Sequence, residues 1–291
     1  MKQILLLFTA AAAVSPASIF ILLAGAPSMS IAFYRMVASS LILLPFFLYR
    51  SYKKSITPLT GHDAVLTIIA GLCLSAHFAT WVTSLFYTPV ANSVILVTTQ
   101  PIYVAILGWI FLKEKLGYKG IIGIIVAVSG AIVIAGGDFN LSSEYMLGDI
   151  LAIIGAIMAA SYFTIGRQVR KKVHLLTYIF YCYTISAIGL LPVVLIFSQP
   201  LHGFSGMTWF YFFLLGLIPT VIGHSLYNWA LKYLRAFWVG VCILGEPIGA
   251  TLLAWIVLDQ KPTFFFYIGA ALIGVGLLVL FSTEKVESAP A

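Results

Sequence analysis

The chain has 291 residues, of which 62% are hydrophobic and 9% are charged, and it carries a formal net charge of +7. Soluble domains contain about 25% charged residues, so this composition excludes an ordinary soluble protein and indicates an integral membrane protein. The positive charge does not indicate nucleic-acid binding, because the basic residues sit in separate short loops and form no continuous basic face.

Ten apolar runs, separated by short polar or Gly/Pro breaks, are each long enough to cross a bilayer, which takes about 20 residues. The runs are continuously apolar, whereas the strands of a membrane barrel would alternate apolar and polar residues. We therefore predict an all-α membrane protein with ten transmembrane helices. The runs cover, approximately, residues 4–25, 29–49, 64–87, 91–112, 117–135, 145–166, 174–198, 207–231, 235–258 and 264–281.

Basic residues in the loops predict the orientation of the chain. If the N-terminus is cytoplasmic, 14 of the 16 Lys and Arg residues fall on the cytoplasmic side, against Lys261 in an outer loop and Arg35 within a span. The positive-inside rule therefore predicts a multi-pass protein of the cell (plasma) membrane with both termini in the cytoplasm. The N-terminal stretch imitates a signal peptide, but we keep it as the first helix because cleavage would leave nine spans and remove the symmetry described next.

An internal repeat is the strongest feature of the sequence. The segment Thr98–Gly130 aligns without gaps with Leu244–Gly276, at a constant offset of 146 residues. Shared apolar composition would produce some matches, but it does not readily explain the paired Pro, Trp and Lys residues. These pairs are Pro101 and Pro247, Trp109 and Trp255, and Lys115 and Lys261.

Each half of the chain holds five predicted spans, so the second half enters the membrane from the opposite side. We predict a first five-helix repeat over residues 1–137, a second over residues 145–283, and a short cytoplasmic tail over residues 284–291. Inverted repeats are a recurrent plan of secondary transporters, in which the substrate site lies near the midplane where the halves meet. This plan predicts alternating access.

The ten helices in a 5+5 repeat, with QPIYVAILGWIFLKEKLG closing the first half and EPIGATLLAWIVLDQKPT closing the second, resemble the EamA type of the drug/metabolite transporter superfamily. The resemblance spans the whole chain. It implies a small-solute carrier whose central cavity is lined by helices 1–4 and 6–9, with helices 5 and 10 packed outside. The sequence departs from the family at Gln100, where many relatives carry Glu, so two equivalent carboxylates are not implied.

Glu246 and Gln100 lie near mid-depth in the ninth and fourth spans, and each precedes a proline. An ionisable group in a span costs about 2.5–3.5 kcal/mol on insertion scales, so Glu246 is a candidate for function. Pro101 and Pro247 cannot donate to the helix ladder, so we expect bent helices and free carbonyls four residues before each proline. Either Glu246 contributes to a substrate site, or it is neutral and bonded to a neighbouring helix.

Polar and aromatic residues recur at helical spacing on the third and eighth spans, so each helix carries one such stripe. Two stripes in corresponding halves predict a shared aqueous cavity. His77 falls one residue from His224 under the offset of 146. Such a pair could titrate in a proton-coupled cycle, and neutral histidines bonded to neighbouring helices are the alternative. The stripes comprise His77, Thr80, Trp81 and Ser84, and Thr220, His224, Tyr227 and Asn228.

Three further polar residues within spans have two interpretations each. Tyr181 and Ser15 suit an amphipathic organic solute, whereas most residues of these types serve interfacial anchoring or helix packing. Arg35 lies about six residues into the second span. Its long stem favours snorkelling to the lipid headgroups, and the alternative is an anion contact at the outer mouth.

The three cysteines lie within spans and form no CxxC pattern, so we predict neither a metal site nor a cofactor. The predicted partners are the lipid bilayer, a small-molecule substrate and protons as coupling ion, for a monomer or homodimer. The leading hypothesis is a secondary transporter that exports small organic metabolites such as amino acids. An intramembrane enzyme would show clustered catalytic groups and a channel would show a filter; these remain the alternatives.

Overall fold

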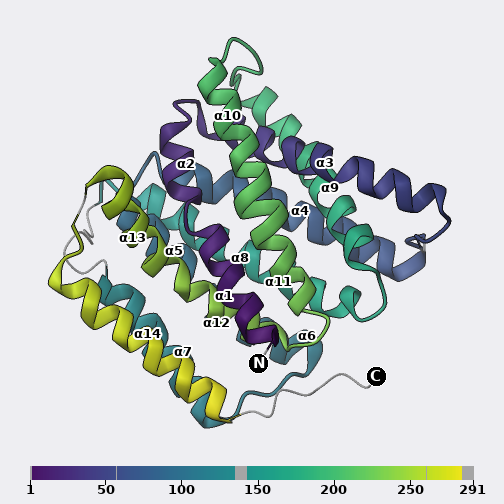
Figure 1. The fold of residues 1–291 in the computed structure, drawn as a ribbon. Helices are drawn as coiled ribbons and strands as arrows, with labels where there is room; N and C mark the ends of the chain where they lie inside the picture. Colours follow the sequence, from purple (N-terminus) through teal and green to yellow (C-terminus); the bar gives the residue numbers. More distant parts are fainter. Residues whose placement is uncertain (1, 57, 135–142, 260, 284–291) are drawn as a thin grey trace.

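A computed structural model describes residues 2–56, 58–134, 143–259 and 261–283, and the predicted tail 284–291 lies outside this range. The secondary structure of the described residues is entirely helical, which confirms the all-α prediction (Figure 1). The elements are α1 (Lys2–Val14), α2 (Ala17–Leu23), α3 (Ser28–Tyr52), α4 (Gly61–Ser84), α5 (Val90–Thr98), α6 (Gln100–Leu112), α7 (Tyr118–Ile134), α8 (Met146–Arg170), α9 (Leu175–Ile196), α10 (Gly206–Leu215), the π-helical η1 (Gly216–His224), α11 (Ser225–Ala230), α12 (Ala236–Cys242), the 3₁₀ turn η2 (Ile243–Gly245), α13 (Glu246–Leu258) and α14 (Phe264–Thr283).

These elements form ten apolar segments in the order that the sequence predicts. Eight segments are long and apolar enough to cross a membrane, and α7 and α14 are shorter apolar helices. Four segments are interrupted rather than straight, and each interruption lies within a few residues of Pro16, Pro101, Pro219 or Pro247. Proline removes a backbone donor and crowds the preceding turn, so the helix ladder changes pitch or restarts there.

Equivalent elements of the two halves begin at equivalent residues. α5, α6 and α7 begin at Val90, Gln100 and Tyr118, and α12, α13 and α14 begin 146 residues later in each case. The restart at α6 therefore corresponds to the restart at α13, directly before the paired prolines. The two halves share one pattern of helix boundaries over this region.

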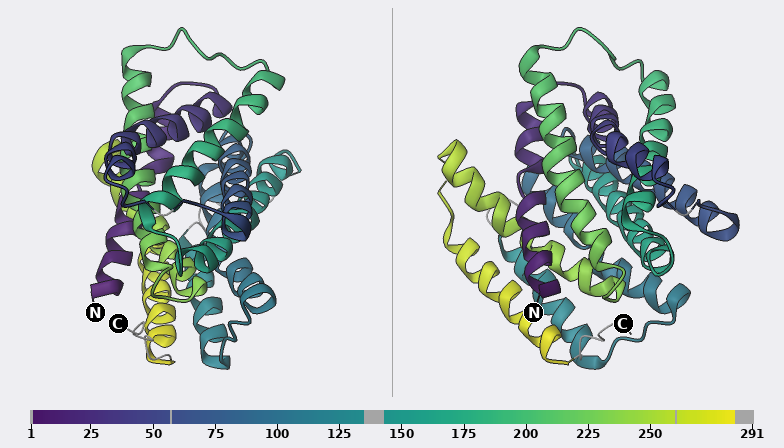
Figure 2. Two further views of the ribbon diagram at one scale, coloured as in Figure 1. Left: turned by 90° about the vertical axis from the view of Figure 1, so that its right-hand side faces the viewer. Right: turned by 45° about the vertical axis from the view of Figure 1, so that its right-hand side comes forward.

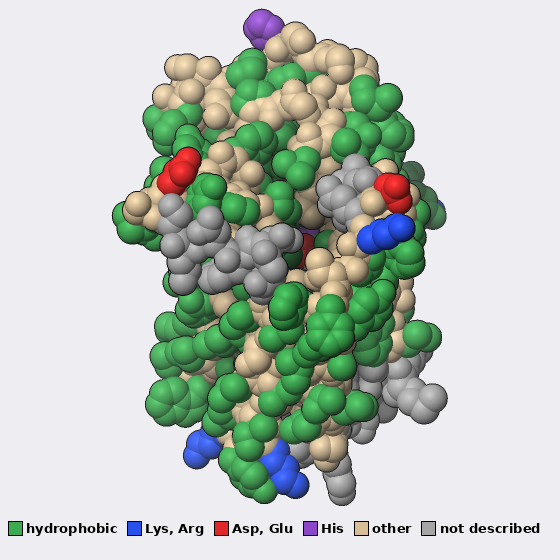
Figure 3. Space-filling view, turned by 90° about the vertical axis from the view of Figure 1, so that its left-hand side faces the viewer, with side chains coloured by type: hydrophobic (Ala, Val, Ile, Leu, Met, Phe, Trp, Pro, Cys, Tyr) green, Lys and Arg blue, Asp and Glu red, His purple; other side chains and the backbone are tan. Residues whose placement is uncertain are grey.

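The centre of the molecule is a bundle in which α4 packs along α8 and α9, α3 packs along α9 and η1, and α1 packs along η1. The first turn of α1 and the last turn of α14 lie at one end of this bundle, and the start of α10 lies at the other (Figure 2). Large hydrophobic side chains are exposed around its sides, and they cover most of the face that carries α13 and α14 (Figure 3). Such a surface matches hydrocarbon and not water.

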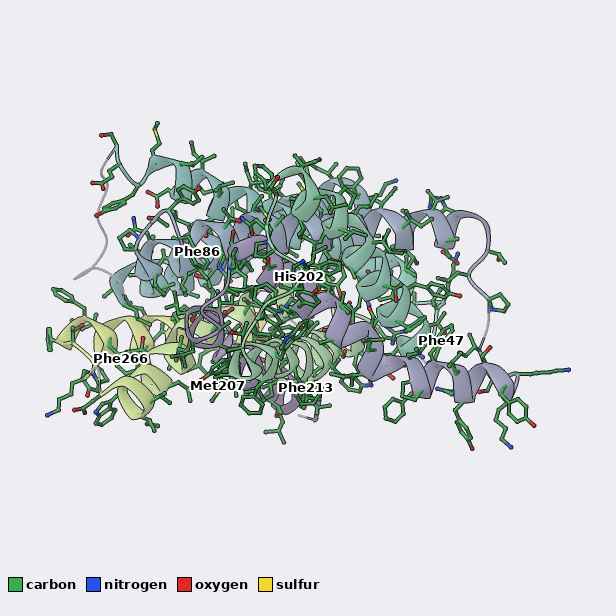
Figure 4. All side chains as sticks on the ribbon, turned by 90° about the horizontal axis from the view of Figure 1, so that it is seen from above. Phe47, Phe86, His202, Met207, Phe213 and Phe266 are labelled. Carbon is green, nitrogen blue, oxygen red and sulfur yellow. The ribbon has the colours of Figure 1, made fainter. Side chains whose placement is uncertain are left out.

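The pair α7 and α14 lies to one side of the bundle, with Phe266 at that edge and Phe47 of α3 at the opposite edge (Figure 4). Their most extensive contact is with each other. A side chain at Gly130 would place its Cβ 2.6 Å from the Gly269 carbonyl oxygen, and one at Gly276 would place its Cβ 2.6 Å from the Gly123 carbonyl oxygen. The missing side chains let two antiparallel backbones touch, as small residues do in membrane helices.

Candidate functional site

A small cavity of about 30 Å³ lies among the middle turns of the central helices. Its volume is enough for about two water molecules. Six of its lining residues are polar or amphipathic, and they come from both halves of the chain. On the face that carries α13, Figure 3 shows a recess with an acidic side chain in it. The lining comprises His77 and Trp81 of α4, Gln100 of α6, His224 of η1, Tyr227 of α11 and Glu246 of α13, together with Val14, Val97, Phe163 and Ile243.

The helix interruptions position four of these residues. α5 ends at Thr98 and α6 begins at Gln100, while the 3₁₀ turn η2 carries the chain into α13 at Glu246. Val97 and Ile243, four residues before the paired prolines, both line the cavity. Prolines at these positions remove the usual helical donors of the Val97 and Ile243 carbonyls. The expectation of a free carbonyl is wrong at Ile243, because the Glu246 amide donates to it in the 3₁₀ turn. The same local chemistry therefore places a polar side chain beside polar backbone on both sides of the cavity.

The two imidazoles lie near each other in this cavity, with ring centres 6.5 Å apart. His77 shares a hydrogen bond with the Gly155 carbonyl through Nδ1, at 2.9 Å, and stacks on Trp81. His224 has aromatic neighbours, and its Nδ1 has no hydrogen-bond partner among the described residues. One histidine is thus fixed by backbone, whereas the other keeps a polar atom available.

Arg35 is buried in the bundle, and the prediction that it snorkels to the headgroups is wrong. Its side chain is 0% exposed, and its Nε donates to Thr220 Oγ1 at 2.8 Å. The guanidinium lies 4.1 Å from the centre of the Phe78 ring, and its Nη1 and Nη2 have no partner among the described residues. Because η1 offers a hydroxyl and α4 an aromatic face, the side chain turns inward and not toward lipid.

Glu246 is the second buried charge of this region, with 6% of its surface exposed. Its charge interacts with that of Arg35, yet no ion pair within 4.0 Å joins them in the described part of the chain. A buried pair is normally stable only when the two groups meet with good geometry and further hydrogen bonds. Glu246 lines the cavity and Arg35 does not, so the acid and the base are both buried in this region without touching.

Asn228, Tyr181 and Ser15 lie outside the cavity lining. Asn228 donates to the Tyr162 hydroxyl and to the His224 carbonyl, both at 2.6 Å, so it braces two helices beside the site. Tyr181 is partly exposed and packs on Phe47 and Phe180. Ser15 donates to the Ala11 carbonyl and lines a separate apolar groove. These three side chains contribute to packing in this conformation.

A polar network at the end that carries the basic loops was not foreseen as a unit. Arg167 of α8 forms an ion pair with Glu114 at 3.1 Å, and both side chains are about 90% buried. Arg167 also donates to the Leu231 and Lys232 carbonyls, and the second carboxylate oxygen of Glu114 accepts from the Ala236 amide. We call these five residues the Arg167 network. It ties the ends of α6, α8, α11 and α12 together.

The opposite end has its own polar connections between segments. Asp149 of α8 accepts from Thr88 at 2.7 Å and from Asn92 at 3.2 Å. Gln199, beyond α9, accepts from the Met29 amide at the start of α3. No group of three or more His, Cys, Asp or Glu side chains that could hold a metal occurs within the described ranges.

The sequence profile of the EamA-like transporter family matches residues 1–136 and, a second time, residues 146–282. The chain belongs to this family. Two relatives are an uncharacterized transporter of Archaeoglobus fulgidus, 25% identical over 261 residues with 88% of each chain covered, and the uncharacterized transporter YyaM of Bacillus subtilis, 26% identical over 258 residues with 87% of this chain and 83% of the relative covered. A crystal structure of 20% identity superposes with a TM-score of 0.80 over 96% of each chain, so this EamA-like transporter has a known fold.

Proposed function

We propose that this protein is a secondary transporter that exports small organic solutes such as amino acids by alternating access, with the central cavity as its substrate site. Membership of the EamA-like family supplies the transporter class. The observation that carries the finer proposal is a pair of buried, oppositely charged residues that form no ion pair among the described residues: Glu246 in the cavity lining and Arg35, whose Nη1 and Nη2 have no partner there. An unpaired buried charge is costly, so a site that retains two of them implies a complementary ligand.

An amino acid carries the charges that this couple lacks. A carboxylate can accept from the two free Nη groups of Arg35, for which a planar fork is the matching partner. The ammonium group of the solute can donate to Glu246. Its side chain can lie against Trp81 and Tyr227, which both line the cavity. Protons are the coupling ion in this scheme, taken up at His224 or Glu246.

Three features support the inverted-repeat plan that alternating access needs. The boundaries of the last helices in each half coincide at the offset of 146, and the family profile matches each half separately. The helix contacts also come in equivalent pairs, because α4 packs on α8 and η1 packs on α1, while α4 packs on α9 and η1 packs on α3. Related halves can adopt two arrangements of similar energy, one open to each side.

The conformation has little room for a solute, because the cavity of about 30 Å³ holds only water. Solute entry therefore requires the halves to separate at one end. The Arg167 network closes the end with the basic loops, which the positive-inside rule places in the cytoplasm of a plasma-membrane protein, with both termini on that side. In this scheme the network opens when the cytoplasmic path forms, and the chain acts as a monomer or a homodimer.

The test is counterflow in proteoliposomes loaded with unlabelled amino acid and challenged with the same labelled amino acid outside, across a panel that includes nucleobases and cations. We expect saturable counterflow for a solute that carries both a carboxylate and an amine. Glu246→Gln should lower the counterflow rate about tenfold or more, since a charge-assisted hydrogen bond is lost. Uptake without counterflow would indicate a channel. Wild-type rates for Glu246→Gln at every pH would remove this carboxylate from the mechanism.

A further inference from the structure

Two apolar grooves flank the pair α7 and α14, one on each side. The first lies between α6 and α7 and has a volume of about 580 Å³, and the second lies between α1, α13 and α14 and has a volume of about 650 Å³. They exist because α7 and α14 contact each other far more extensively than they contact the bundle. Both grooves are large enough for part of a lipid chain, whereas the central cavity is not.

The two grooves differ in charge. The groove between α6 and α7, which we call the α6–α7 groove, is lined by the exposed side chains of Ile106, Trp109, Ile121 and Ile125 and by one cation, Lys115. The groove between α1, α13 and α14 has no charged residue in its lining. Only the α6–α7 groove therefore combines an apolar wall with an ammonium group at its end.

The surroundings of Lys115 add positive charge. Lys113 and Lys119 lie in the same short segment and are exposed, and Arg235 donates to the Lys115 carbonyl at 3.2 Å. Glu114, the acidic residue of the segment 113–119, is already neutralised by Arg167. Lys113, Lys115 and Lys119 form no ion pair among the described residues. The end of the groove therefore presents three ammonium groups at the level where lipid headgroups begin, as basic pockets between membrane helices do when they bind anionic lipids.

We propose that the α6–α7 groove is a binding site for an anionic phospholipid, with an acyl chain against Ile106, Ile121 and Ile125 and the phosphate at Lys115. The charges favour this occupant over a second copy of the chain. A symmetric dimer across this groove would bring Lys113, Lys115 and Lys119 of both copies together, and like charges oppose such an interface. The site is independent of the transport cycle proposed above.

Trp109 gives a local readout, because its indole lies in the groove and is 62% exposed. The protein is reconstituted in phosphatidylcholine vesicles that contain either brominated phosphatidylglycerol or brominated phosphatidylcholine, and tryptophan quenching is measured. The difference between the wild type and Trp109→Phe isolates this indole. From this quenching we expect the affinity of the site for phosphatidylglycerol to be about fivefold higher than its affinity for phosphatidylcholine. That factor corresponds to about 1 kcal/mol for one basic group near an anionic headgroup.

Three variants distinguish binding of the lipid in the α6–α7 groove from a general attraction of anionic lipids to the basic surface. Lys115→Gln should remove the preference for the anionic lipid, and Ala105→Phe, which fills the groove, should reduce quenching by both lipids. Lys261→Gln, at the repeat-equivalent position and outside both groove linings, should leave the preference unchanged. Equal quenching by the two lipids in the wild type, or a preference that survives in Lys115→Gln, would overturn the proposal.

Discussion

At the residue scale, Arg35 and Glu246 place two opposite charges in the same interior without a direct ion pair. Arg35 is held by the Thr220 hydroxyl and by the rings of Phe78 and Trp81, 4.1 Å and 5.9 Å from the guanidinium carbon. This arrangement fixes the guanidinium plane and leaves two nitrogen atoms for a ligand. A carboxylate would satisfy both nitrogens at once.

Replacement of Arg35 should therefore distinguish a ligand contact from a structural cation. We expect Arg35→Gln to raise the KM for carboxylate-bearing solutes about tenfold or more, because a bidentate charged contact is lost. Arg35→Lys should recover only part of the affinity, since an ammonium group lacks the planar fork. Counterflow measures both values. Equal KM values for a solute and its uncharged amide in the wild type would contradict this role.

His174 gives a prediction outside the membrane-spanning segments. Its Nδ1 accepts from the Leu176 amide and so caps α9, and the guanidinium of Arg50 lies 2.8 Å from its Nε2. Partial burial, together with the charges of Arg50, Arg170 and Lys232, holds the pKa of His174 below its usual value of 6.5. The contribution of His174 to stability is complete above about pH 6.5 and is lost as pH falls through the lowered pKa of the folded state.

Thermal unfolding in detergent between about pH 5 and 8 tests this contribution, since an imidazole titrates in that window. The wild type should lose stability on the acidic side. His174→Asn keeps a capping group and cannot take up the proton, so its curve should be flatter. Identical pH profiles for the two proteins would show that His174 does not act in this way.

The sequence predicts which polar residues meet in the interior, but it does not predict the direction of the Arg35 side chain. Glu246, Gln100, His77 and His224 line one cavity because their spacing and depth already aligned them. Arg35 differs because its direction depends on Thr220, which lies in the π-helical η1. A π-helical turn shifts the face of every later residue, and the 3.6-residue period used to read the sequence contains no such shift.

At the scale of elements, the contact of α7 with α14 depends on glycine at four positions. Gly269 touches the Gly130 carbonyl so closely that a Cβ would lie 2.4 Å away, whereas Gly274 in the same helix has no neighbouring atom within 4 Å of such a Cβ. The two glycines therefore form a matched pair, one at the contact and one facing open space.

We expect Gly269→Val to destabilise the protein by about 1–3 kcal/mol, the range for overpacking a close contact. Gly274→Val adds the same side chain without a clash and should stay near the wild type. The midpoint of thermal unfolding in one detergent measures both. Equal midpoints for the two variants would show that α7 and α14 are not held together through these glycines.

The existence and order of the ten segments followed from hydropathy alone, since lipid demands continuous helices. The interruptions were harder to anticipate. Pro16 divides the first segment into α1 and α2, whereas Pro45 and Pro192 lie inside α3 and α9 without interrupting them. Whether a proline breaks a helix depends on which neighbours satisfy the freed carbonyl, and tertiary packing decides that.

At the scale of the whole molecule, the offset of 146 links the sequence to the fold, because helix starts in the two halves coincide at that offset. Repetition is visible in sequence because each half must build the same helix packing. The sequence does not show which conformation the two halves adopt. In the proposed cycle, the closed Arg167 network and the small cavity belong to one of two arrangements of the halves, and one sequence encodes both.

The most direct test of alternating access is the reactivity of a single thiol at Gln100, which lines the cavity. Cys73, Cys182 and Cys242 are first replaced by alanine, Gln100→Cys is introduced, and a membrane-impermeant thiol reagent is applied to either side of oriented vesicles. We predict labelling from both sides and slower labelling in the presence of a transported solute. Labelling from one side only under every condition, or from neither side, would contradict the account.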